Sequence, residues 1–371
     1  MLVHLVAGAR PNFMKIAPIV RAFRKQAAAP APGEGRLEFR LIHTGQHYDR
    51  EMNAVFFEEL GIPQPDVSMT GGGGTHAEQT ARIMLGFEQL CTAHKPDAVL
   101  VVGDVDSTLA CAIVAKKLQI PVAHVEAGLR SGDRSMPEEI NRLVTDSISD
   151  WFFVTEPAAL EHLRREGKPA AAVHHVGHVM ADNVLFQADK LAGAPPEPSG
   201  FKARHGAGRY GVVTLHRPGN VDQPATLARI AGALRQVACD LPLIFPLHPR
   251  TRDRLAQSGI DLGPDIELAA PQAYMPFLDV WKDAAVVLTD SGGLQEETTA
   301  LGVPCITLRE NTERPITVDE GSNVLAGTDP DRILCETRKI LRGEGKRGRR
   351  PYLWDGRAAE RIAGVLARET R

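Results

Sequence analysis

Cysteine is scarce and long apolar runs are lacking in this chain of 371 residues. The five cysteines are scattered and form no CxxC pair, and four of them lie among apolar neighbours. This arrangement predicts buried free thiols in a reducing cytoplasm and neither a zinc site nor disulfides. No apolar run approaches the roughly 18 residues that a membrane helix needs, and the first residues lack the features of a signal peptide. We therefore expect a cytoplasmic protein without a membrane partner.

An excess of positive charge is also lacking. With 43 basic and 46 acidic residues, the formal net charge is −3. This balance argues against the basic face that binds a nucleic-acid duplex, so we expect no nucleic-acid partner. The basic stretch 339–350 is expected to be a solvated loop. Hydrophobic residues make up 43% of the chain, which suffices for the cores of about two domains at this length.

Short apolar runs alternate with longer amphipathic segments along the chain. In the first half, the predicted strands are 2–6, 37–43, 98–102, 122–125, 151–154 and 173–176. In the second half, they are 210–214, 243–247, 266–269, 285–289 and 304–307. Strands that alternate with helices in this way are typical of parallel sheets and predict an α/β fold.

The segment 192–208, with the sequence AGAPPEPSGFKARHGAG, interrupts this alternation. Its density of Pro and Gly predicts an exposed linker between two domains. We expect a first domain at 1–195 and a second at 205–352. The last predicted helix, 357–368, is followed by no strand. The tetraglycine at 71–74 does not directly follow a strand, which favours a loop over a phosphate site.

Polar side chains gather where the predicted strands end. They are Arg10, Lys15, Asp104, Glu126, His216, Arg217, His248 and Asp290. In open α/β sheets, ligands bind outside the carboxyl ends of the strands. Each residue taken singly also has a structural explanation, as a surface cation, a helix-capping acid or a buried histidine. Their recurrence at several strand ends favours the functional interpretation and predicts one ligand cleft between two domains.

The most specific local motif is DSGGLQEE at 290–297. A strand followed by a Ser-Gly-Gly turn and a helix start exposes backbone N–H groups, which bind a diphosphate with help from the helix dipole. A carboxylate one turn into the helix would reach a ribose hydroxyl. The alternative is an ordinary glycine-rich turn. No GxGxxG follows the first strand and no P-loop signature occurs, which disfavours a nicotinamide dehydrogenase and a P-loop ATPase.

A series of motifs together resembles those of the non-hydrolysing UDP-N-acetylglucosamine 2-epimerases. In chain order they are GARPNFMKIAPI, TGQHYD, GDVDST, HVEAGLRSGD, MPEEINR, TLHRPGN, PLHPR, DSGGLQEE and ENTERPITV. The resemblance implies a GT-B fold, with two Rossmann-like parallel-sheet domains facing a central cleft. It also implies that a C-terminal helix, at about 355–371, packs back on the first domain. A UDP-sugar substrate, a homodimer, and no metal or cofactor follow from the same resemblance.

The resemblance further implies roles for individual residues. The implied catalytic residues are Asp104, Glu126 and Glu138, near the hexose, and His216. The implied diphosphate-binding residues are Ser291, Gly292 and Gly293. The other implied substrate-binding residues are Arg10, Lys15 and Arg314 near the phosphates and sugar, Glu297 at the ribose, and Gln272 and Phe277 at the uridine. Glu138 is chosen over Glu139 because it directly follows Pro137, as in the PEE motif of the family.

The implied reaction is a reversible inversion at C2 that interconverts UDP-N-acetylglucosamine and UDP-N-acetylmannosamine for cell-surface polysaccharides. The hydrogen at C2 has no adjacent carbonyl and is very weakly acidic. In the family, UDP departs from C1 as C2 is deprotonated, which gives 2-acetamidoglucal. Reprotonation from the opposite face and return of UDP complete the inversion. Cations and helix N–H groups would stabilise the diphosphate, and carboxylates would exchange the protons.

Two departures from the family pattern leave the exact sugar open. His178 stands where relatives often carry Asn, which bears on the sugar pocket. The segment TGQHYDREM, with Gln46 and His47, is longer than in many bacterial members, where this region belongs to an activating second UDP-sugar site. The longer form resembles relatives that epimerise UDP-2,3-diacetamido-2,3-dideoxyglucuronate. The alternatives are hydrolysis to free N-acetylmannosamine, a GT-B glycosyltransferase and a non-catalytic UDP-sugar-binding regulator. The diphosphate motif alone does not separate a glycosyltransferase from an epimerase, but the joint presence of Asp104, Glu126 and Glu138 favours epimerisation.

Overall fold

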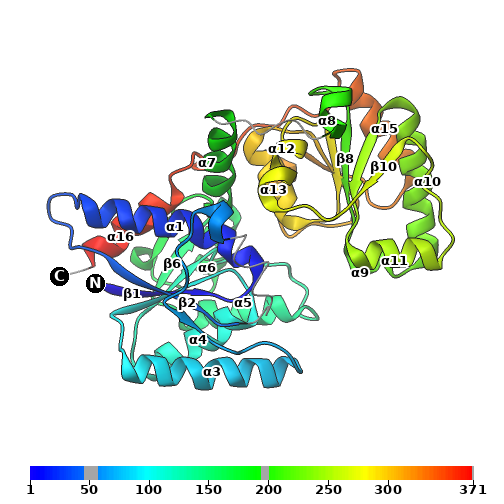
Figure 1. Ribbon diagram of the computed structural model, residues 1–371. Helices are drawn as coiled ribbons and strands as arrows, with labels where there is room; N and C mark the ends of the chain where they lie inside the picture. Colours follow the sequence, from blue (N-terminus) through cyan, green and yellow to red (C-terminus); the bar gives the residue numbers. More distant parts are fainter. Residues whose placement is uncertain (46–56, 194–199, 370–371) are drawn as a thin grey trace. The chain divides into compact units, whose positions relative to one another are not determined.

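The computed structural model describes residues 1–45, 57–193 and 200–369. The chain divides into two compact units, which we call unit 1 (residues 1–183 and 352–371) and unit 2 (residues 184–351) (Figure 1). The division falls inside α7 (Val179–Gly193). It thus lies upstream of the Pro/Gly-rich segment at 192–208, part of which is outside the described residues.

Unit 1 is built on a parallel sheet that has seven strands in the described part of the chain. In spatial order the strands are β3 (Val67–Ser68), β2 (Glu38–His43), β1 (Leu2–Ala7), β4 (Ala98–Val102), β5 (Val122–Val125), β6 (Trp151–Val154) and β7 (Val173–His175). Every neighbouring pair is parallel. The central strands are buried on both faces, which explains why they are continuous apolar runs.

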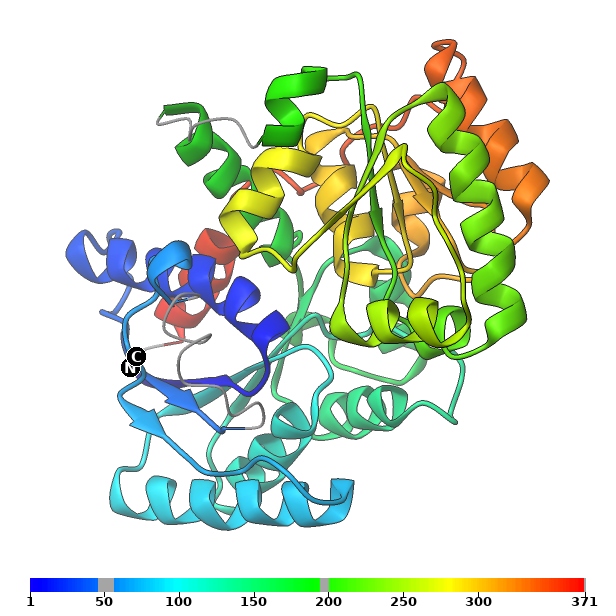
Figure 2. The same ribbon diagram turned by 45° about the vertical axis from the view of Figure 1, so that its right-hand side comes forward.

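Helices cover both faces of this sheet. They are α1 (Arg10–Ala28), α3 (His76–Ala93), α4 (Asp106–Lys117), α5 (Pro137–Ile148), α6 (Pro157–Arg165) and α16 (Ala358–Arg368), with a 3-10 turn at Ala170–Ala172. α1 and α16 lie on one face, and α3 and α4 lie on the other (Figures 1 and 2). Local sequence sets the helix starts, since Thr75 and Glu78 form a capping box for α3 and Pro137 begins α5.

The chain returns to unit 1 after it has completed unit 2. α16 packs against α1, and Asp182 accepts hydrogen bonds from the backbone N–H groups of Ala358 (3.1 Å) and Ala359 (2.8 Å) at its start. The segment just before α16 passes close to Gly177. A Cβ atom on Gly177 would lie 2.0 Å from the carbonyl oxygen of Leu353. Gly177 also has a φ of +89°, so this crossing of two segments requires glycine.

Unit 2 contains a second parallel sheet, with six strands among the described residues. In spatial order they are β10 (Ile266–Ala269), β9 (Leu243–Pro246), β8 (Gly211–Thr214), β11 (Val286–Thr289), β12 (Cys305–Thr307) and β13 (Asn323–Leu325). Its helices are α8 (Gly200–His205), α9 (Pro218–Val221), α10 (Pro224–Asp240), α11 (Pro249–Gln257), α12 (Tyr274–Trp281), α13 (Gly292–Leu301), α14 (Pro315–Asp319) and α15 (Pro330–Leu341). The two sheets confirm the predicted α/β class with two Rossmann-like parallel-sheet domains.

The structure corrects the expectation of buried thiols. Cys91, Cys111 and Cys305 are buried, but Cys239 and Cys335 are exposed, and all five are free. The two exposed residues lie on α10 and α15, where apolar neighbours in sequence point to another face of the helix. In the described ranges, no helix is long and apolar enough to cross a membrane.

Candidate functional site

Glu126 and Lys15 form a buried ion pair at the carboxyl edge of the unit 1 sheet. Glu126 directly follows β5, and Lys15 lies in the second turn of α1. The Nζ atom of Lys15 is 2.5 Å from Oε2 of Glu126, and both side chains are at least nine-tenths buried. Gly103 makes room for the pair, because a Cβ atom there would lie 3.0 Å from Nζ of Lys15. Two residues predicted from separate strand ends therefore meet.

The backbone of Glu126 is in the left-handed region, with a φ of +69°. Few residues other than glycine adopt this conformation. The N–H groups of Glu126 and Ala127 both donate to the carbonyl oxygen of Phe153, at 3.0 and 3.2 Å, which holds the turn at the edge of the sheet. Strained backbone of this kind clusters at functional sites, where the surrounding structure maintains it.

Asp104 belongs to a second group of charges at the same edge. It follows β4 and forms an ion pair with Arg142 of α5, whose other nitrogen lies 2.8 Å from Glu139. Glu139 is buried and also accepts hydrogen bonds from Ser131. Although burial disfavours its ionised form, these hydrogen bonds hold the pKa of Glu139 below its ordinary value. Glu138, the residue implied by the resemblance, is exposed one position earlier on α5.

A buried hydrogen-bond network, which the sequence does not predict, supports the loops after β4 and β5. His124 inside β5 is hydrogen-bonded at both ring nitrogens. Nε2 donates to the carbonyl oxygen of Gly103 at 2.8 Å, and Nδ1 lies 2.7 Å from the carboxylate of Asp146. Asp146 also accepts hydrogen bonds from the N–H of Gly128 at 3.0 Å and from Arg130 at 2.7 Å. The network therefore fixes the loops that carry Asp104 and Glu126. The polar histidine in an otherwise apolar strand is the one signal of it in the sequence.

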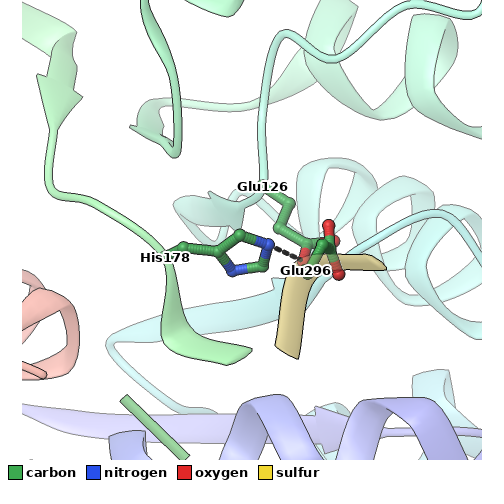
Figure 3. Close-up of side chains that lie close together, drawn as sticks. All are labelled: Glu126, His178 and Glu296. Atoms are coloured by element: carbon green, nitrogen blue, oxygen red, sulfur yellow. Dashed lines mark ion pairs between the residues drawn. The ribbon is translucent and has the colours of Figure 1, made fainter. Parts of the chain in front are cut away.

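His178 lies beside Glu126 (Figure 3). Its Nδ1 atom accepts a hydrogen bond from the N–H of Met180 at 3.1 Å, which leaves the proton of a neutral ring on Nε2. Nε2 is 3.9 Å from Oε1 of Glu126. The ring also packs edge-to-face on Trp354, with 4.8 Å between the ring centroids. The returning C-terminal segment thus fixes the orientation of this histidine.

The Ser-Gly-Gly turn of unit 2 forms the start of α13, as the sequence predicts. Ser291 is the N-cap residue, and Gly292 is the first helical residue. The side chain of Ser291 makes no capping hydrogen bond, and the first turn of this fully described helix contains no acidic residue. A Cβ atom on Gly292 would lie 4.0 Å from a terminal nitrogen of Arg217, so a cation lies beside the turn. This arrangement suits an anion.

His216 lies next to this turn, at the carboxyl end of β8. Its side chain is 43% exposed, and its Nδ1 atom is 3.0 Å from the carboxylate of the fully buried Asp290. Asp290 was part of the predicted motif but had no assigned role. Although burial disfavours the ionised form, hydrogen bonds from the ring and from two backbone N–H groups hold the pKa of Asp290 below its ordinary value.

Glu297, expected at the ribose, is buried in the second turn of α13. Its Oε1 atom accepts a hydrogen bond from the hydroxyl of Tyr274 on α12 at 2.8 Å. Burial raises the pKa of Glu297 to about 8, the Tyr274 hydrogen bond opposes this shift, and the nearby Glu296 carboxylate adds to it. The carboxyl group is therefore largely protonated at neutral pH. Gln272 is exposed and Phe277 is half-buried.

Arg314 precedes α14 and forms an ion pair with the buried Glu296 of α13. The loop before it is tied to α13 as well, because Thr312 donates a hydrogen bond to Gln295 at 2.6 Å. His248, which the strand-end pattern also singled out, accepts the N–H of Arg250 as the N-cap of α11. Its placement agrees with a structural role.

Three expected residues have no described side chain. The backbone of Arg10 begins α1, but its side chain is outside the described part of the chain. Gln46 and His47 lie outside the described residues altogether. Their implied roles stay predictions.

Comparisons with known proteins agree with the resemblance. A family model for UDP-N-acetylglucosamine 2-epimerase matches residues 32–367. The UDP-N-acetylglucosamine 2-epimerase of Methanocaldococcus jannaschii is 39% identical over 372 residues, which cover 99% of each chain. A crystal structure of that enzyme in complex with UDP-GlcNAc and UDP aligns with a TM-score of 0.85 over 99% of both chains. The UDP-2,3-diacetamido-2,3-dideoxy-D-glucuronate 2-epimerase of Pseudomonas aeruginosa is 38% identical over 375 residues, 99% of this chain and 100% of its own.

Proposed function

The chain belongs to the UDP-N-acetylglucosamine 2-epimerase family, and we propose that it interconverts UDP-N-acetylglucosamine and UDP-N-acetylmannosamine without net hydrolysis. The observation that carries the proposal is the contrast between the two sheet edges. Unit 1 gathers the carboxylates Asp104 and Glu126, each paired with a cation. Unit 2 presents the first turn of α13 beside Arg217.

An elimination at C1 and C2 needs both kinds of group. A carboxylate of unit 1 takes the proton from C2 while the C1–O bond breaks and its electron pair passes to the diphosphate. A C1–C2 double bond forms. The developing negative charge on UDP is stabilised at the Ser291–Gly293 turn by the N–H groups of Gly292 and Gly293, and by the cations of Arg217, Arg10 and Arg314. A second acid then protonates C2 on the opposite face, and the diphosphate oxygen bonds to C1 again.

The residues divide between these two tasks. We assign proton transfer at C2 to Asp104, Glu126 and Glu138, and we assign contact with the departing diphosphate to His216. Lys15 neutralises Glu126 and holds its carboxylate in place. Glu297, Gln272 and Phe277 would contact the ribose and uridine.

A second candidate substrate is favoured by one observation. The Pseudomonas aeruginosa relative that acts on UDP-2,3-diacetamido-2,3-dideoxy-D-glucuronate is nearly as similar as the Methanocaldococcus jannaschii enzyme. The reaction at C2 is the same for both sugars, so the carboxylates and the diphosphate turn do not distinguish them. Comparison of kcat/KM for the two sugars decides which one the enzyme uses.

The deciding experiment is incubation of the purified protein with UDP-N-acetylglucosamine in heavy water, followed by proton NMR. We expect UDP-N-acetylmannosamine with deuterium at C2, because a carboxylate exchanges its proton with solvent between the two steps. Free N-acetylmannosamine would show that the enzyme hydrolyses its substrate. Product that keeps the original hydrogen at C2 would overturn the elimination mechanism. Unchanged substrate would indicate either a non-catalytic UDP-sugar-binding regulator or an enzyme that acts on UDP-2,3-diacetamido-2,3-dideoxy-D-glucuronate.

The resemblance also leads us to propose a homodimer. Light scattering after gel filtration tests this directly, with an expected mass of twice the 40.2 kDa of the chain. A mass equal to one chain would reject it.

A further inference from the structure

Asp290 is a buried acid at the end of β11 with an unusual set of donors. Its carboxylate accepts hydrogen bonds from the backbone N–H groups of His216 (3.1 Å) and Arg217 (2.9 Å). It also accepts one from the side-chain amide of Asn220 at 3.1 Å, and it lies 3.0 Å from Nδ1 of the His216 ring. Four donors from one short segment, 216–220, therefore converge on a single carboxylate.

The geometry determines which nitrogen of His216 carries the proton. An ionised carboxylate only accepts hydrogen bonds, so Nδ1 must be protonated to face it at 3.0 Å. The other nitrogen, Nε2, then accepts a hydrogen bond when the ring is neutral and donates one when the ring is charged. Asp290 itself has no exposed surface, whereas the ring is 43% exposed, so any effect of Asp290 on a ligand must pass through His216.

The same carboxylate ties three strand ends together. Asp290 directly follows β11 and precedes Ser291, the N-cap of α13. His216 and Arg217 follow β8, and Asn220 also donates to the carbonyl oxygen of Leu308, beyond β12, at 2.8 Å. The position of the His216 ring relative to the Ser291–Gly293 turn is therefore set by one side chain.

We propose that Asp290 is a positioning residue that holds His216 in the Nδ1–H tautomer and directs Nε2 at the oxygens of a diphosphate bound at the Ser291–Gly293 turn. The inference rests on the proposed function in that the diphosphate is the leaving group of a UDP-sugar. When the diphosphate binds, Nε2 takes up a second proton from solvent and the ring becomes charged. As the C1–O bond breaks, Nε2 donates this proton in a hydrogen bond to the leaving oxygen. Asp290 stabilises the positive ring in that state and keeps its orientation.

The test is Asp290→Asn, which keeps the shape of the side chain. The new amide has one accepting oxygen for four donors, and its NH₂ group must face at least one of them. Facing Nδ1, it forces that nitrogen to accept and moves the ring proton to Nε2. We expect nitrogen-15 NMR of labelled protein, with His216 assigned by comparison with His216→Ala, to show the Nδ1–H tautomer in the wild type and the Nε2–H tautomer in the variant. An Nε2–H tautomer in the wild type would overturn the proposal whatever the enzyme catalyses.

Kinetics separate positioning from a structural role. We expect Asp290→Asn to lower kcat by at least about 100-fold, as for loss of an oriented acid–base group, while KM and UDP affinity change less than about threefold. In a His216→Ala background the same change should lower kcat by less than about threefold, because the group through which Asp290 acts is gone. Full, additive loss in that background would reject the proposal.

Asp279→Asn is the matched control. Asp279 is also a buried acid of unit 2, but among the described residues its ion pairs are with Lys202 at 2.8 Å and Lys282 at 3.4 Å. We expect its kcat to stay within about twofold of the wild type. If both Asp290→Asn and Asp279→Asn lose activity equally, the effect is structural. If the tautomer changes as expected but the wild type shows no epimerase activity, the proposed function fails and the positioning role stands.

Discussion

The segments that follow β4 and β11 hold the same place in the two sheets and carry opposite chemistry. Each of these strands lies beside the first strand of its unit, β1 or β8, and each is followed by a loop and a helix. The helix after β4 begins with Asp106, which accepts hydrogen bonds from Gln79 at 2.8 Å and Asn141 at 3.2 Å. The helix after β11 begins with two glycines and has no acid in its first turn.

The difference shows how one architecture separates two tasks. At the start of α4, a carboxylate of the chain itself complements the helix dipole, so this end does not attract an external anion. At the start of α13, the preceding acid, Asp290, is turned toward His216, so the N–H groups of Gly292 and Gly293 are available to a ligand. Acids with cations mark the unit 1 edge, and N–H donors with cations mark the unit 2 edge.

The largest effect should follow from removal of acids at the unit 1 edge. We expect Asp104→Asn and Glu126→Gln to lower kcat by about 100-fold or more, because each removes a group proposed to transfer a proton. UDP affinity, measured by calorimetry, should change less than about threefold, since the proposed diphosphate contacts other than Arg10 belong to unit 2 and neither variant alters Arg10. Asp133→Asn, an exposed change in the same unit, is the control with wild-type activity. Equal losses of kcat and UDP affinity would contradict the assignment of proton transfer to unit 1 and diphosphate binding to unit 2.

Two buried carboxyl groups should respond to pH with opposite signs. The pKa of Glu297 is raised to about 8 by burial, so between its ordinary value of 4.5 and about 8 the folded chain holds a proton that the unfolded chain has lost. Stability therefore falls as pH rises through this interval, by roughly 3–5 kcal/mol. The pKa of Glu139 is lowered, so its contribution is present above the ordinary value and is lost as pH falls through the folded pKa.

Urea unfolding of two variants between acidic and alkaline pH measures this contrast. Glu297→Gln should be more stable than the wild type at alkaline pH and similar at acidic pH. Glu139→Gln should be less stable at neutral pH, with a deficit that shrinks toward acid. The same pH slope in both variants would contradict the assignment.

An acid placed at the start of α13 should make the unit 2 edge resemble the unit 1 edge. We expect Gly292→Asp to weaken UDP binding at least tenfold, about 1.4 kcal/mol, because its carboxylate repels the diphosphate and occupies the N–H groups. The control is Gly292→Ala, whose Cβ would lie 4.0 Å from its nearest neighbour, a nitrogen of Arg217. The alanine variant should bind UDP within about threefold of the wild type. Unchanged UDP binding by Gly292→Asp would contradict the proposal that this turn binds the diphosphate.

The smallest effect concerns a second difference between the units, namely that unit 1 is built from two separate segments of the chain and unit 2 from one. Unit 1 depends on a distant segment, and Asp182 holds the start of that segment through Ala358 and Ala359. We expect Asp182→Asn to destabilise unit 1 by about 1 kcal/mol, because an amide replaces two good acceptor sites with one. Hydrogen exchange should become faster in α16 and stay unchanged in α13. Faster exchange in both helices would mean that the units do not unfold separately.

The sequence predicted the parts of this molecule that follow from local pattern. Buried parallel strands are continuous apolar runs, so their positions and the α/β class could be predicted, and the strand-end rule led to Lys15, Glu126 and His216. β3 and β13 have only two and three residues, too few for a pattern.

The remaining features depend on contacts between distant residues. The pairing of His124 with Asp146, the donors that surround Asp290 and the contact of Gly177 with Leu353 join positions that no local motif connects. The division between the two units falls inside α7, which continues through it without a helix breaker, so no local pattern marks it. The burial of Glu139 beside an exposed Glu138 likewise depends on how α5 packs.

The late return of the chain to unit 1 has a consequence for biosynthesis. As the chain leaves the ribosome, unit 2 emerges as one uninterrupted stretch. Unit 1 cannot complete its fold until α16 has been synthesised and packs on α1, and until Trp354 packs on His178. Until then the apolar faces of α1 that α16 will bury stay open to water, a state in which nascent chains aggregate or recruit chaperones. The first half of the protein to be translated is therefore the last to become complete.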